Sequence, residues 1–443
     1  MHGVDGIPPE LARRVAEFIE QRSVAVPLGR TARQGEFDTG LTSITAGGLD
    51  ADTAWALFRD VVAPVNVGLH SERFLAFIPA APTPVSVWMD AVVSASSFSA
   101  ESSLEAAGAV AAENEVLRWM CDLVGFPEHA GGCFLSGGTI GNLSALAVGR
   151  SVAEGRDVVV VADSAHASID NALRLMGLTA LVVATDDDGR MTGAAVADAV
   201  AGRTDIGIVV ASGGSTNAGV VDDLDGIGTV ARELNAWFHV DAAYGGAALL
   251  VEGTRELFVG VDRADSVVID PHKWLFAPLG SGAVLYRDPT LAVAVHRQVG
   301  PYIDVFQGDD AGWNPSDYAL QLTRRATGLP LWFSLVVHGV DAYATAVEAS
   351  IEMARRTAEL FETIDGVSVL MPPQLGVVLF RRDGWGRDEW RRWATRLLDD
   401  GIAFVAPTSV RGEIVGRLVF LHPGTPFSVV EEIAATLGPT SHS

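Results

Sequence analysis

The chain has 443 residues, a length that suits a large enzyme domain with a smaller domain appended to it. Hydrophobic residues make up 49% of it, and 55 acidic residues outnumber 31 basic ones to give a formal net charge of −24. Such an acidic chain lacks the basic face that nucleic acids require, so we expect no nucleic-acid partner.

Cysteine content and hydropathy narrow the cellular setting. The two cysteines, Cys121 and Cys133, cannot form a disulfide framework, and we expect both to pack in the core. The N-terminus is charged and helix-like rather than a secretory signal. No stretch reaches the roughly 18 to 20 apolar residues of a membrane span. We therefore expect a cytoplasmic protein without a membrane partner, and we predict no metal site.

The first 83 residues are predicted to form a helical and extended segment. Residues 9–22 follow a proline pair and have the periodicity of an amphipathic helix, and a second helix is predicted over about 50–63. Residues 84–100 are apolar with many small side chains, which is typical of a buried helix. Residues 104–122 are strongly helical.

The pattern then changes to short β-branched runs that alternate with helices. Runs that are apolar on both faces and separated by helices predict a mostly parallel sheet covered on both sides. Ligands of such sheets bind at the carboxyl ends of the strands, so the residues after each run are candidates for the site. The predicted strands are Val158–Val161, Ala180–Val183, Ile206–Ala211, Phe238–Val240, Ser266–Ile269 and Gly282–Tyr286.

The C-terminal part is predicted to be a separate small α+β domain. A long helical pattern runs from Trp332 to about Thr363, and strands and helices follow it. We place the large domain at 84–337 and the small domain at 338–443. The strand-like runs of the small domain are Gly366–Leu370, Gly376–Arg381, Ile402–Val405 and Arg417–Leu421.

Lys273 follows the end of a predicted strand, in the sequence Pro-His-Lys-Trp. Desolvation at a strand end would lower the pKa of its amine and leave the neutral form that attacks a carbonyl cofactor. A lysine considered alone is more often a solvated surface charge, and this segment by itself leaves that alternative open.

Asp241 ends another strand-like run and is followed by small residues, which leave room for a flat ring. A carboxylate at this position could keep the nitrogen of a pyridine ring protonated, so that the ring accepts electrons from a substrate. An aspartate at the start of a helix would give the same local pattern, so both interpretations stay open.

Three weaker signals accompany these two, and His166 and Thr216 among them follow strand-like runs. The Gly-rich turn in 134–143 opens a helix and could bind a phosphate through its backbone amides, or could be an ordinary helix start. His166 could stack on a cofactor, transfer a proton or be structural. The hydroxyl of Thr216 could bind a cofactor oxygen or belong to a simple turn. All five signals fall at one predicted edge of one sheet, which favours a shared cofactor site.

With these motifs the sequence resembles the group II pyridoxal-phosphate-dependent decarboxylases, such as the aromatic-L-amino-acid decarboxylases. The likeness runs from about His70 through the helix at Trp332 and continues more weakly to the C-terminus. Its most specific motifs are Asp-Ala-Ala-Tyr at 241–244 and Pro-His-Lys-Trp at 271–274, with 32 residues from Asp241 to Lys273. The resemblance implies fold type I of the pyridoxal-phosphate enzymes with a seven-stranded sheet, pyridoxal 5'-phosphate as cofactor, and a tight homodimer with the N-terminal helices on the partner.

The resemblance also implies roles for individual residues. Lys273 would form the internal aldimine with the cofactor. Tyr302 would lie on a mobile loop and protonate the substrate carbon, and a Tyr rather than Phe there favours decarboxylation over oxidative deamination. The remaining cofactor contacts would be Gly138, Thr139 and His272 at the phosphate, His166 and Ala243 on the two ring faces, Asp241 at the ring nitrogen and Thr216 near the oxygen substituents.

The sequence departs from the aromatic decarboxylases at two positions. Asp270 stands where they usually have Asn, and Leu69 stands where they have a Trp in the substrate pocket. The pocket is therefore less aromatic, and the substrate stays open. The other expected pocket residues are Phe77, Ile78 and Pro79, with Ser96 and Phe98 supplied by the partner subunit.

The resulting prediction is an enzyme that decarboxylates an L-amino acid to the corresponding amine and carbon dioxide through the Lys273 aldimine. Two alternatives keep the cofactor and change the chemistry, namely a decarboxylative oxidase or aldehyde synthase, and an aminotransferase. A third alternative is a degenerate homologue that acts as a scaffold, but the intact cofactor residues argue against it.

Overall fold

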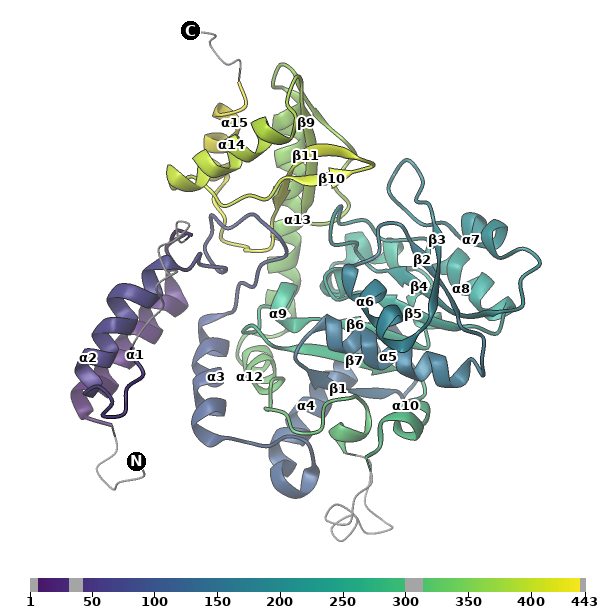
Figure 1. Cartoon of the computed structure of the whole chain (residues 1–443), viewed down its shortest axis with the longest axis horizontal. Helices are drawn as coiled ribbons and strands as arrows, with labels where there is room; N and C mark the ends of the chain where they lie inside the picture. The colour runs from purple at the N-terminus through teal and green to yellow at the C-terminus, as the bar shows by residue number, and fades with distance from the viewer. Residues whose placement is uncertain (1–6, 32–42, 299–313, 439–443) are drawn as a thin grey trace.

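The computed structural model describes residues 7–31, 43–298 and 314–438 (Figure 1). Its centre is a seven-stranded sheet in the order β1-β7-β6-β5-β4-β2-β3, in which β7 runs antiparallel to both neighbours and the other strands run parallel. The mostly parallel α/β sheet predicted from the sequence is confirmed. Its strands are β1 (Gly131–Leu135), β2 (Val158–Ala162), β3 (Thr179–Val183), β4 (Ile206–Ser212), β5 (Trp237–Asp241), β6 (Ser266–Ile269) and β7 (Gly282–Tyr286).

Strand β1 had no counterpart among the strands predicted from local patterns. It is five residues long and begins with two glycines, which are depleted in strands. The glycine at 132 is required by packing, because a Cβ there would lie 1.8 Å from the backbone oxygen of Val284 on β7. The strand is thus defined by its close approach to β7, which a local pattern does not reveal.

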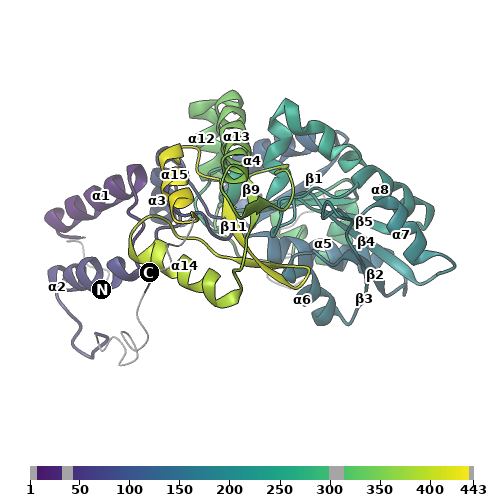
Figure 2. The same cartoon turned by 90° about the horizontal axis from the view of Figure 1, so that it is seen from above.

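Helices cover both faces of the sheet, because successive strand residues point to opposite sides. Val159 and Ile208 pack with α5, α6 and α10 on one face, and Val160 and Val209 pack with α4, α7 and α8 on the other. Figure 2 shows α5 and α6 on one side of the strands and α8 on the other. These helices are α4 (Ser103–Val124), α5 (Gly138–Val152), α6 (Ala167–Met176), α7 (Gly193–Val200), α8 (Leu224–Glu233) and α10 (Pro289–His296).

The C-terminal part forms an antiparallel sheet of four strands in the order β10-β11-β9-β8. Its core contains Phe380, Trp390 and Trp393, all of them buried. The elements are β8 (Val367–Val369), β9 (Val377–Arg382), α14 (Arg387–Asp399), β10 (Thr408–Val410), β11 (Glu413–Val419) and α15 (Phe427–Ala435).

Two details of the C-terminal prediction are wrong. The single helix expected from Trp332 is divided into α12 (Leu329–His338) and α13 (Val340–Glu362), because Gly339 takes a φ of 76° that ends the first helix. The strand expected over Ile402–Val405 is reduced to one bridge between Phe404 and Phe74. The apolar run there is explained by burial against a distant segment rather than by pairing along a strand.

The N-terminal helices lie beside the body of the molecule (Figures 1 and 2). The rings of Trp55 and Phe58 both lie 5.6 Å from the ring of Phe18, so α1 and the helices after residue 50 share a small aromatic contact. Helix α3 was expected to be buried, yet most of its residues are accessible in the single chain. These helices are α1 (Pro9–Val24), α2 (Ala51–Leu57), the short helices Phe58–Val62 and Ala63–Val65, and α3 (Pro84–Ser96).

In the described part of the chain, no helix combines the length and the apolar character needed to cross a membrane.

Candidate active site

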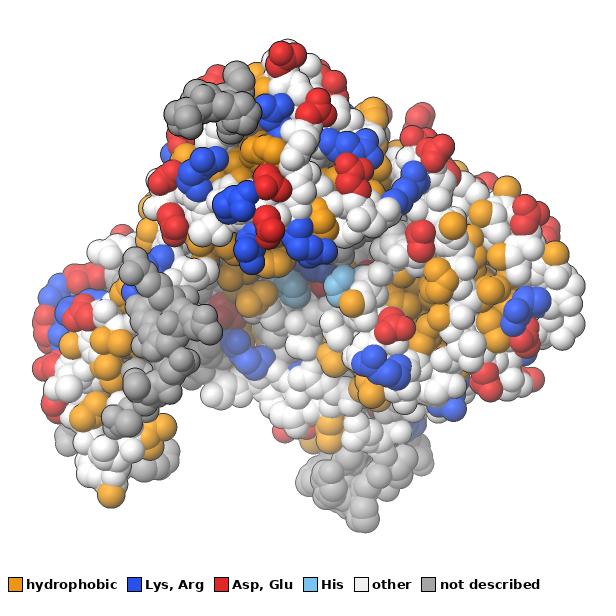
Figure 3. All heavy atoms as spheres, turned by 45° about the horizontal axis from the view of Figure 1, so that its top comes forward, with side chains coloured by type: hydrophobic (Ala, Val, Ile, Leu, Met, Phe, Trp, Pro, Cys, Tyr) orange, Lys and Arg blue, Asp and Glu red, His pale blue; other side chains and the backbone are white. Residues whose placement is uncertain are grey.

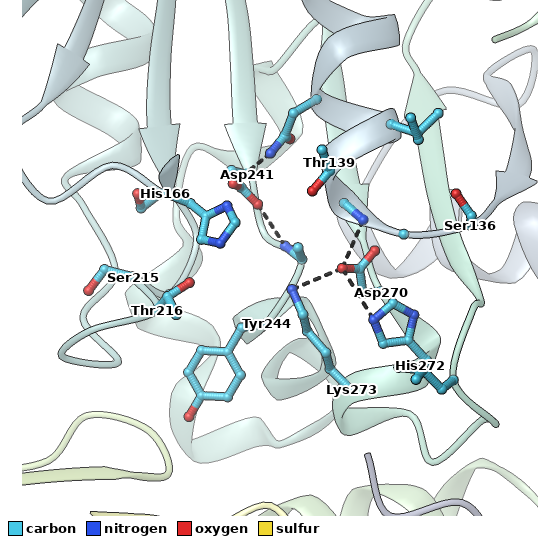
Figure 4. Close-up of a pocket in the computed structure, with 18 residues that line it drawn as sticks. Ser136, Thr139, His166, Ser215, Thr216, Asp241, Tyr244, Asp270, His272 and Lys273 are labelled. Atoms are coloured by element: carbon cyan, nitrogen blue, oxygen red, sulfur yellow. Dashed lines mark hydrogen bonds and ion pairs between the residues drawn. The ribbon is translucent and has the colours of Figure 1, made fainter. Parts of the chain in front are cut away.

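A cavity of about 370 Å³ opens at the carboxyl ends of β4, β5 and β6, beside the first turn of α5. This is the edge at which the sequence placed the ligand. Eight residues predicted to contact the cofactor line this one cavity (Figure 4). They are Gly138, Thr139, His166, Thr216, Asp241, Ala243, His272 and Lys273.

Lys273 projects into the cavity from α9 (Pro271–Trp274), the short helix that follows β6. Its Nζ lies 2.9 Å from Oδ2 of Asp270, and its side chain is 18% exposed. Burial favours the neutral amine, but the negative charges of Asp270 and Asp241 outweigh burial, so the pKa of Lys273 is raised above its usual value. The expectation of a lowered pKa is therefore wrong, because that expectation counted burial without the two carboxylates.

Asp241 is held in place at the end of β5 by two donors. The amide Nδ2 of Asn142 donates to its Oδ2 over 2.8 Å, and the backbone N–H of Ala243 donates to its Oδ1 over 3.2 Å. The second bond closes a tight turn after the strand. No regular helix begins directly at Asp241, and its side chain lines the cavity. These contacts favour the interpretation as a ligand-facing carboxylate.

Asn142 is a site residue that the sequence analysis did not single out. Its amide also donates to the hydroxyl of Ser168 (2.9 Å), which in turn lies 2.8 Å from Nδ1 of His166. The Oδ1 atom of Asn142 lies 3.0 Å from Nε2 of His239, whose Nδ1 lies 2.8 Å from the hydroxyl of Ser266. The network thus joins the carboxylate of Asp241 to the imidazole of His166 through Asn142 and Ser168. The only sequence signal was the position of Asn142 one turn into the helix that follows the Gly-rich turn.

The opposite end of the cavity has the features of a phosphate cradle at the start of α5. Gly137 takes a φ of 146°, and a Cβ there would lie 3.0 Å from the ring of His272. A Cβ on Gly138 would lie 2.9 Å from Asp270 and 3.1 Å from the Cβ of Ala243. Nδ1 of His272 is buried and finds no hydrogen-bond partner among the described residues. The turn therefore needs glycine at positions 137 and 138. The unsatisfied Nδ1 of His272 lies beside it.

Burial lowers the pKa of His272 more than the nearby Asp270 charge raises it, so the neutral imidazole is favoured. A neutral imidazole still has one N–H to donate to an anion. The motif of small residues, helix start and His272 is therefore suited to hold a phosphate group.

Arg417 is a second residue that the sequence analysis did not assign. It lies on β11, in a neighbouring hollow of about 490 Å³ that Lys273 and His166 also line. Its guanidinium donates to three backbone carbonyls, those of Phe77, Thr216 and Asn217. Among the described residues no carboxylate forms an ion pair with Arg417, and burial lowers its pKa to about 10. The only signal in the sequence was an arginine at the start of a predicted apolar strand, Arg417–Leu421.

The two hollows meet between the large sheet and the C-terminal sheet, where Figure 3 shows a depression with histidine side chains at its surface. Of the predicted substrate-pocket residues, Phe77 and Ile78 line the second hollow. The others, Leu69, Pro79, Ser96 and Phe98, line neither hollow of the single chain. Tyr302 lies outside the described residues, so its role stays a prediction.

Comparison with known proteins agrees with this geometry. Residues 50–383 match the model of the pyridoxal-dependent decarboxylase conserved domain. An aromatic-L-amino-acid decarboxylase of Bacillus atrophaeus is 31% identical over 373 residues, which cover 80% of this chain and 78% of that protein. An L-2,4-diaminobutyrate decarboxylase of Rhizobium meliloti (strain 1021) is 32% identical over 372 residues, covering 80% and 74%. A crystal structure of Oryza sativa TDC with PLP and tryptamine superposes with a TM-score of 0.86 at 23% identity, over 99% of this chain and 100% of that one.

Proposed function

Since the chain belongs to the family of pyridoxal-dependent decarboxylases, we propose that it converts an L-amino acid to the corresponding amine and carbon dioxide, with Lys273 as the residue that binds the cofactor covalently. It is a pyridoxal-phosphate-dependent amino-acid decarboxylase. The observation that carries the proposal is the meeting of an amine, a ring-sized space, a carboxylate and a phosphate cradle in one cavity.

The composition of the chain strengthens the assignment of Lys273. Among 31 basic residues it is the only lysine, and the others are arginines. An imine to the cofactor aldehyde requires a primary amine, which the guanidinium of arginine does not provide. Lys273 is therefore the single side chain of this protein that is able to make that link, and it lies in the cavity with the predicted cofactor contacts.

The donors of the cavity fit the cofactor at both ends. Gly138, Thr139 and His272 would hold the phosphate, and the orphaned Nδ1 of His272 together with the glycine-only turn supports this end. Asp241 would face the pyridine nitrogen. When bound, pyridoxal phosphate supplies an electron sink for the pair that remains when the carboxylate leaves the α-carbon.

The surrounding residues would then control charge and protons. Asp241, oriented by Asn142 and Ala243, would hold a proton on the ring nitrogen. Lys273 must lose its proton before its amine reacts, since an ammonium has no lone pair, and the two nearby carboxylates favour the protonated form by raising its pKa. His166 lies beside Asp241 in the same cavity, where its ring could pack on a flat ligand.

Arg417 would bind the carboxylate of the substrate. It is a buried cation with no acidic partner in the described structure, and it lines the hollow next to Lys273. Three of its five N–H groups donate to backbone carbonyls, and the two on Nη1 would donate to the carboxylate of an amino acid that enters the hollow. The proposal predicts that simple amines bind here more weakly than amino acids do.

Absorbance and trapping test the role of Lys273. With pyridoxal phosphate, the purified protein should develop an absorbance band in the visible region, and borohydride should fix the cofactor to the peptide that contains Lys273. Lys273→Ala leaves no side-chain amine in the chain, so band and label should both disappear. A colourless wild-type protein, or a label on another site, would overturn the assignment.

The reaction type is tested by measuring carbon dioxide, ammonia, peroxide and keto acid together for a panel of L-amino acids. Carbon dioxide and amine in equal amounts support decarboxylation. Peroxide with ammonia would identify an aldehyde-forming oxidase, and keto acid an aminotransferase, and either result would overturn the proposed reaction.

The exposed apolar side chains of α3 and α12 support a homodimer. These two helices pack on each other and leave Trp88 (40% exposed), Val92 (50%), Val336 (63%) and Val337 (51%) at the surface. A second copy would cover this face, and we expect the segment 1–83 to pack on it as well. Val336→Glu should convert the dimer to a monomer on size exclusion, and a wild-type monomer with full activity would contradict the proposal.

A further inference from the structure

Asp270 places a carboxylate inside the end of the cavity that is suited to phosphate. Its side chain is 1% exposed, and its Oδ2 accepts the backbone N–H of Gly138 over 3.0 Å. The same oxygen lies 2.9 Å from Nζ of Lys273 and 3.8 Å from Nε2 of His272 (Figure 4). The other oxygen, Oδ1, finds no hydrogen-bond partner among the described residues. This carboxylate is thus buried and only partly satisfied.

The elements packed around Asp270 leave it little freedom to move away. A Cβ on Gly282 of β7 would lie 2.6 Å from Oδ1, and the α5 turn closes the other side at Gly138. The charged and titratable groups that face it are Lys273 and His272 on α9, which begins directly after it. From β5, Asp241 acts on the same lysine. The carboxylate is therefore enclosed beside the first amide of α5.

A phosphate group in this cradle would meet the carboxylate. The phosphate brings a charge of about −1.5 to −2 near neutral pH, and the Gly138 amide that would bind it already donates to Asp270. Two anions that share a buried donor disfavour each other, and one proton between them removes most of the repulsion. The single positive charge of Lys273 would not offset the charge in full, because Asp270 and the phosphate together carry more than one negative charge.

We propose that the cofactor phosphate binds together with one proton, which Asp270 and the phosphate share, so that cofactor affinity falls as the pH rises. The inference rests on the proposed cofactor site and concerns a residue in which this chain departs from the aromatic decarboxylases. The amide of Asn in their position carries no charge and would need no such proton.

The test uses the full-length chain freed of cofactor and benzyl phosphate as the probe. This compound carries a phosphate on a short arm of a flat ring and has no aldehyde and no titrating nitrogen, so it isolates the phosphate end. Calorimetry at pH 8 in two buffers of different ionisation enthalpy counts the protons taken up. The wild type should take up about one proton, and its affinity should fall by up to roughly tenfold per pH unit. Asp270→Asn should take up none and should bind about tenfold more tightly at pH 8.

Two variants locate the proton. Asp241→Asn removes a carboxylate from the other end of the cavity and should keep the proton uptake of the wild type. His272→Gln should also keep it. If uptake survives in Asp270→Asn and disappears in His272→Gln, the imidazole carries the proton and the proposal is overturned.

The wild-type measurement alone is decisive if a variant does not fold, since binding without proton uptake would overturn the inference. The experiments also distinguish a failure of the Asp270 proposal from a failure of the proposed function. A protein that forms the visible band with pyridoxal phosphate but takes up no proton with benzyl phosphate loses only the Asp270 proposal, whereas a colourless protein loses the cofactor assignment.

Discussion

Asp241 ends strand β5 and Asp270 follows the neighbouring parallel strand β6, and both line the same cavity, yet their surroundings differ. Asp241 accepts hydrogen bonds from Asn142 and from a backbone amide, one to each oxygen. Asp270 pairs with Lys273 and with the Gly138 amide through a single oxygen, and its other oxygen is unsatisfied. The topology brings both acids to one edge, but their hydrogen-bond partners differ, and for this reason the proposals above give Asp241 the ring nitrogen of the ligand and Asp270 its phosphate.

The largest contrast is expected in turnover. Asp241→Asn should lower kcat for carbon dioxide release by roughly a thousandfold, because the ring nitrogen would lose the carboxylate that is proposed to keep it protonated. Asp270→Asn should change kcat by less than about tenfold under saturating cofactor, since it acts on cofactor binding. Equal losses in the two variants would show that the two carboxylates do not have separate roles.

The environment of Asp241 is tested by Asn142→Leu. The change removes the donor to Asp241 and leaves Nε2 of His239 buried without a partner. We expect kcat to fall by about a hundredfold and the free energy of unfolding by about 2 kcal/mol. Asn171→Leu on the accessible side of α6 is the matched control and should change neither by much. If kcat survives Asn142→Leu, the strand and the Ala243 amide are sufficient to position Asp241.

His239 extends the same network and gives it a pH dependence. Burial lowers the pKa of His239 from 6.5 to about 4. Between these values the unfolded chain binds a proton that the folded chain does not, so stability is lost as the pH falls from 6.5 to 4. Urea unfolding should detect a loss of up to about 3 kcal/mol from this residue. His239→Gln should flatten the profile in that window, and an unchanged profile would assign the acid sensitivity to other groups.

The smallest expected effect concerns how fast the cofactor attaches. Asp270 and Asp241 raise the pKa of Lys273, so the reactive neutral amine is scarce at pH 7 and the attachment rate should increase with pH. Asp270→Asn removes one of these charges and should speed attachment at pH 7 several-fold. Stopped-flow absorbance of the visible band measures the rate. Identical pH profiles for the two proteins would mean that Asp270 does not control the charge of the lysine.

Most of the large sheet and the location of the site were predictable from local patterns. The β-branched runs from Val158 to Tyr286 correspond to six of the seven strands, because a strand buried on both faces leaves an apolar run in the sequence. Parallel strands place their carboxyl ends at one edge, so the residues after those runs had to meet there. Strand β1 was not found in this way, since its glycines serve a contact with β7 that lies far along the chain.

By itself, therefore, the sequence determined which residues reach the sheet edge, including Lys273 and Asp241, because short-range periodicity specifies where strands end. Only the tertiary structure decided what surrounds those residues. The charge on Lys273 depends on two carboxylates, and Gly138 meets Asp270 across 132 positions of sequence. Arg417 reaches the same region from the C-terminal sheet. Such contacts arise from packing between distant elements, and electrostatic interactions depend on distance in space rather than along the chain.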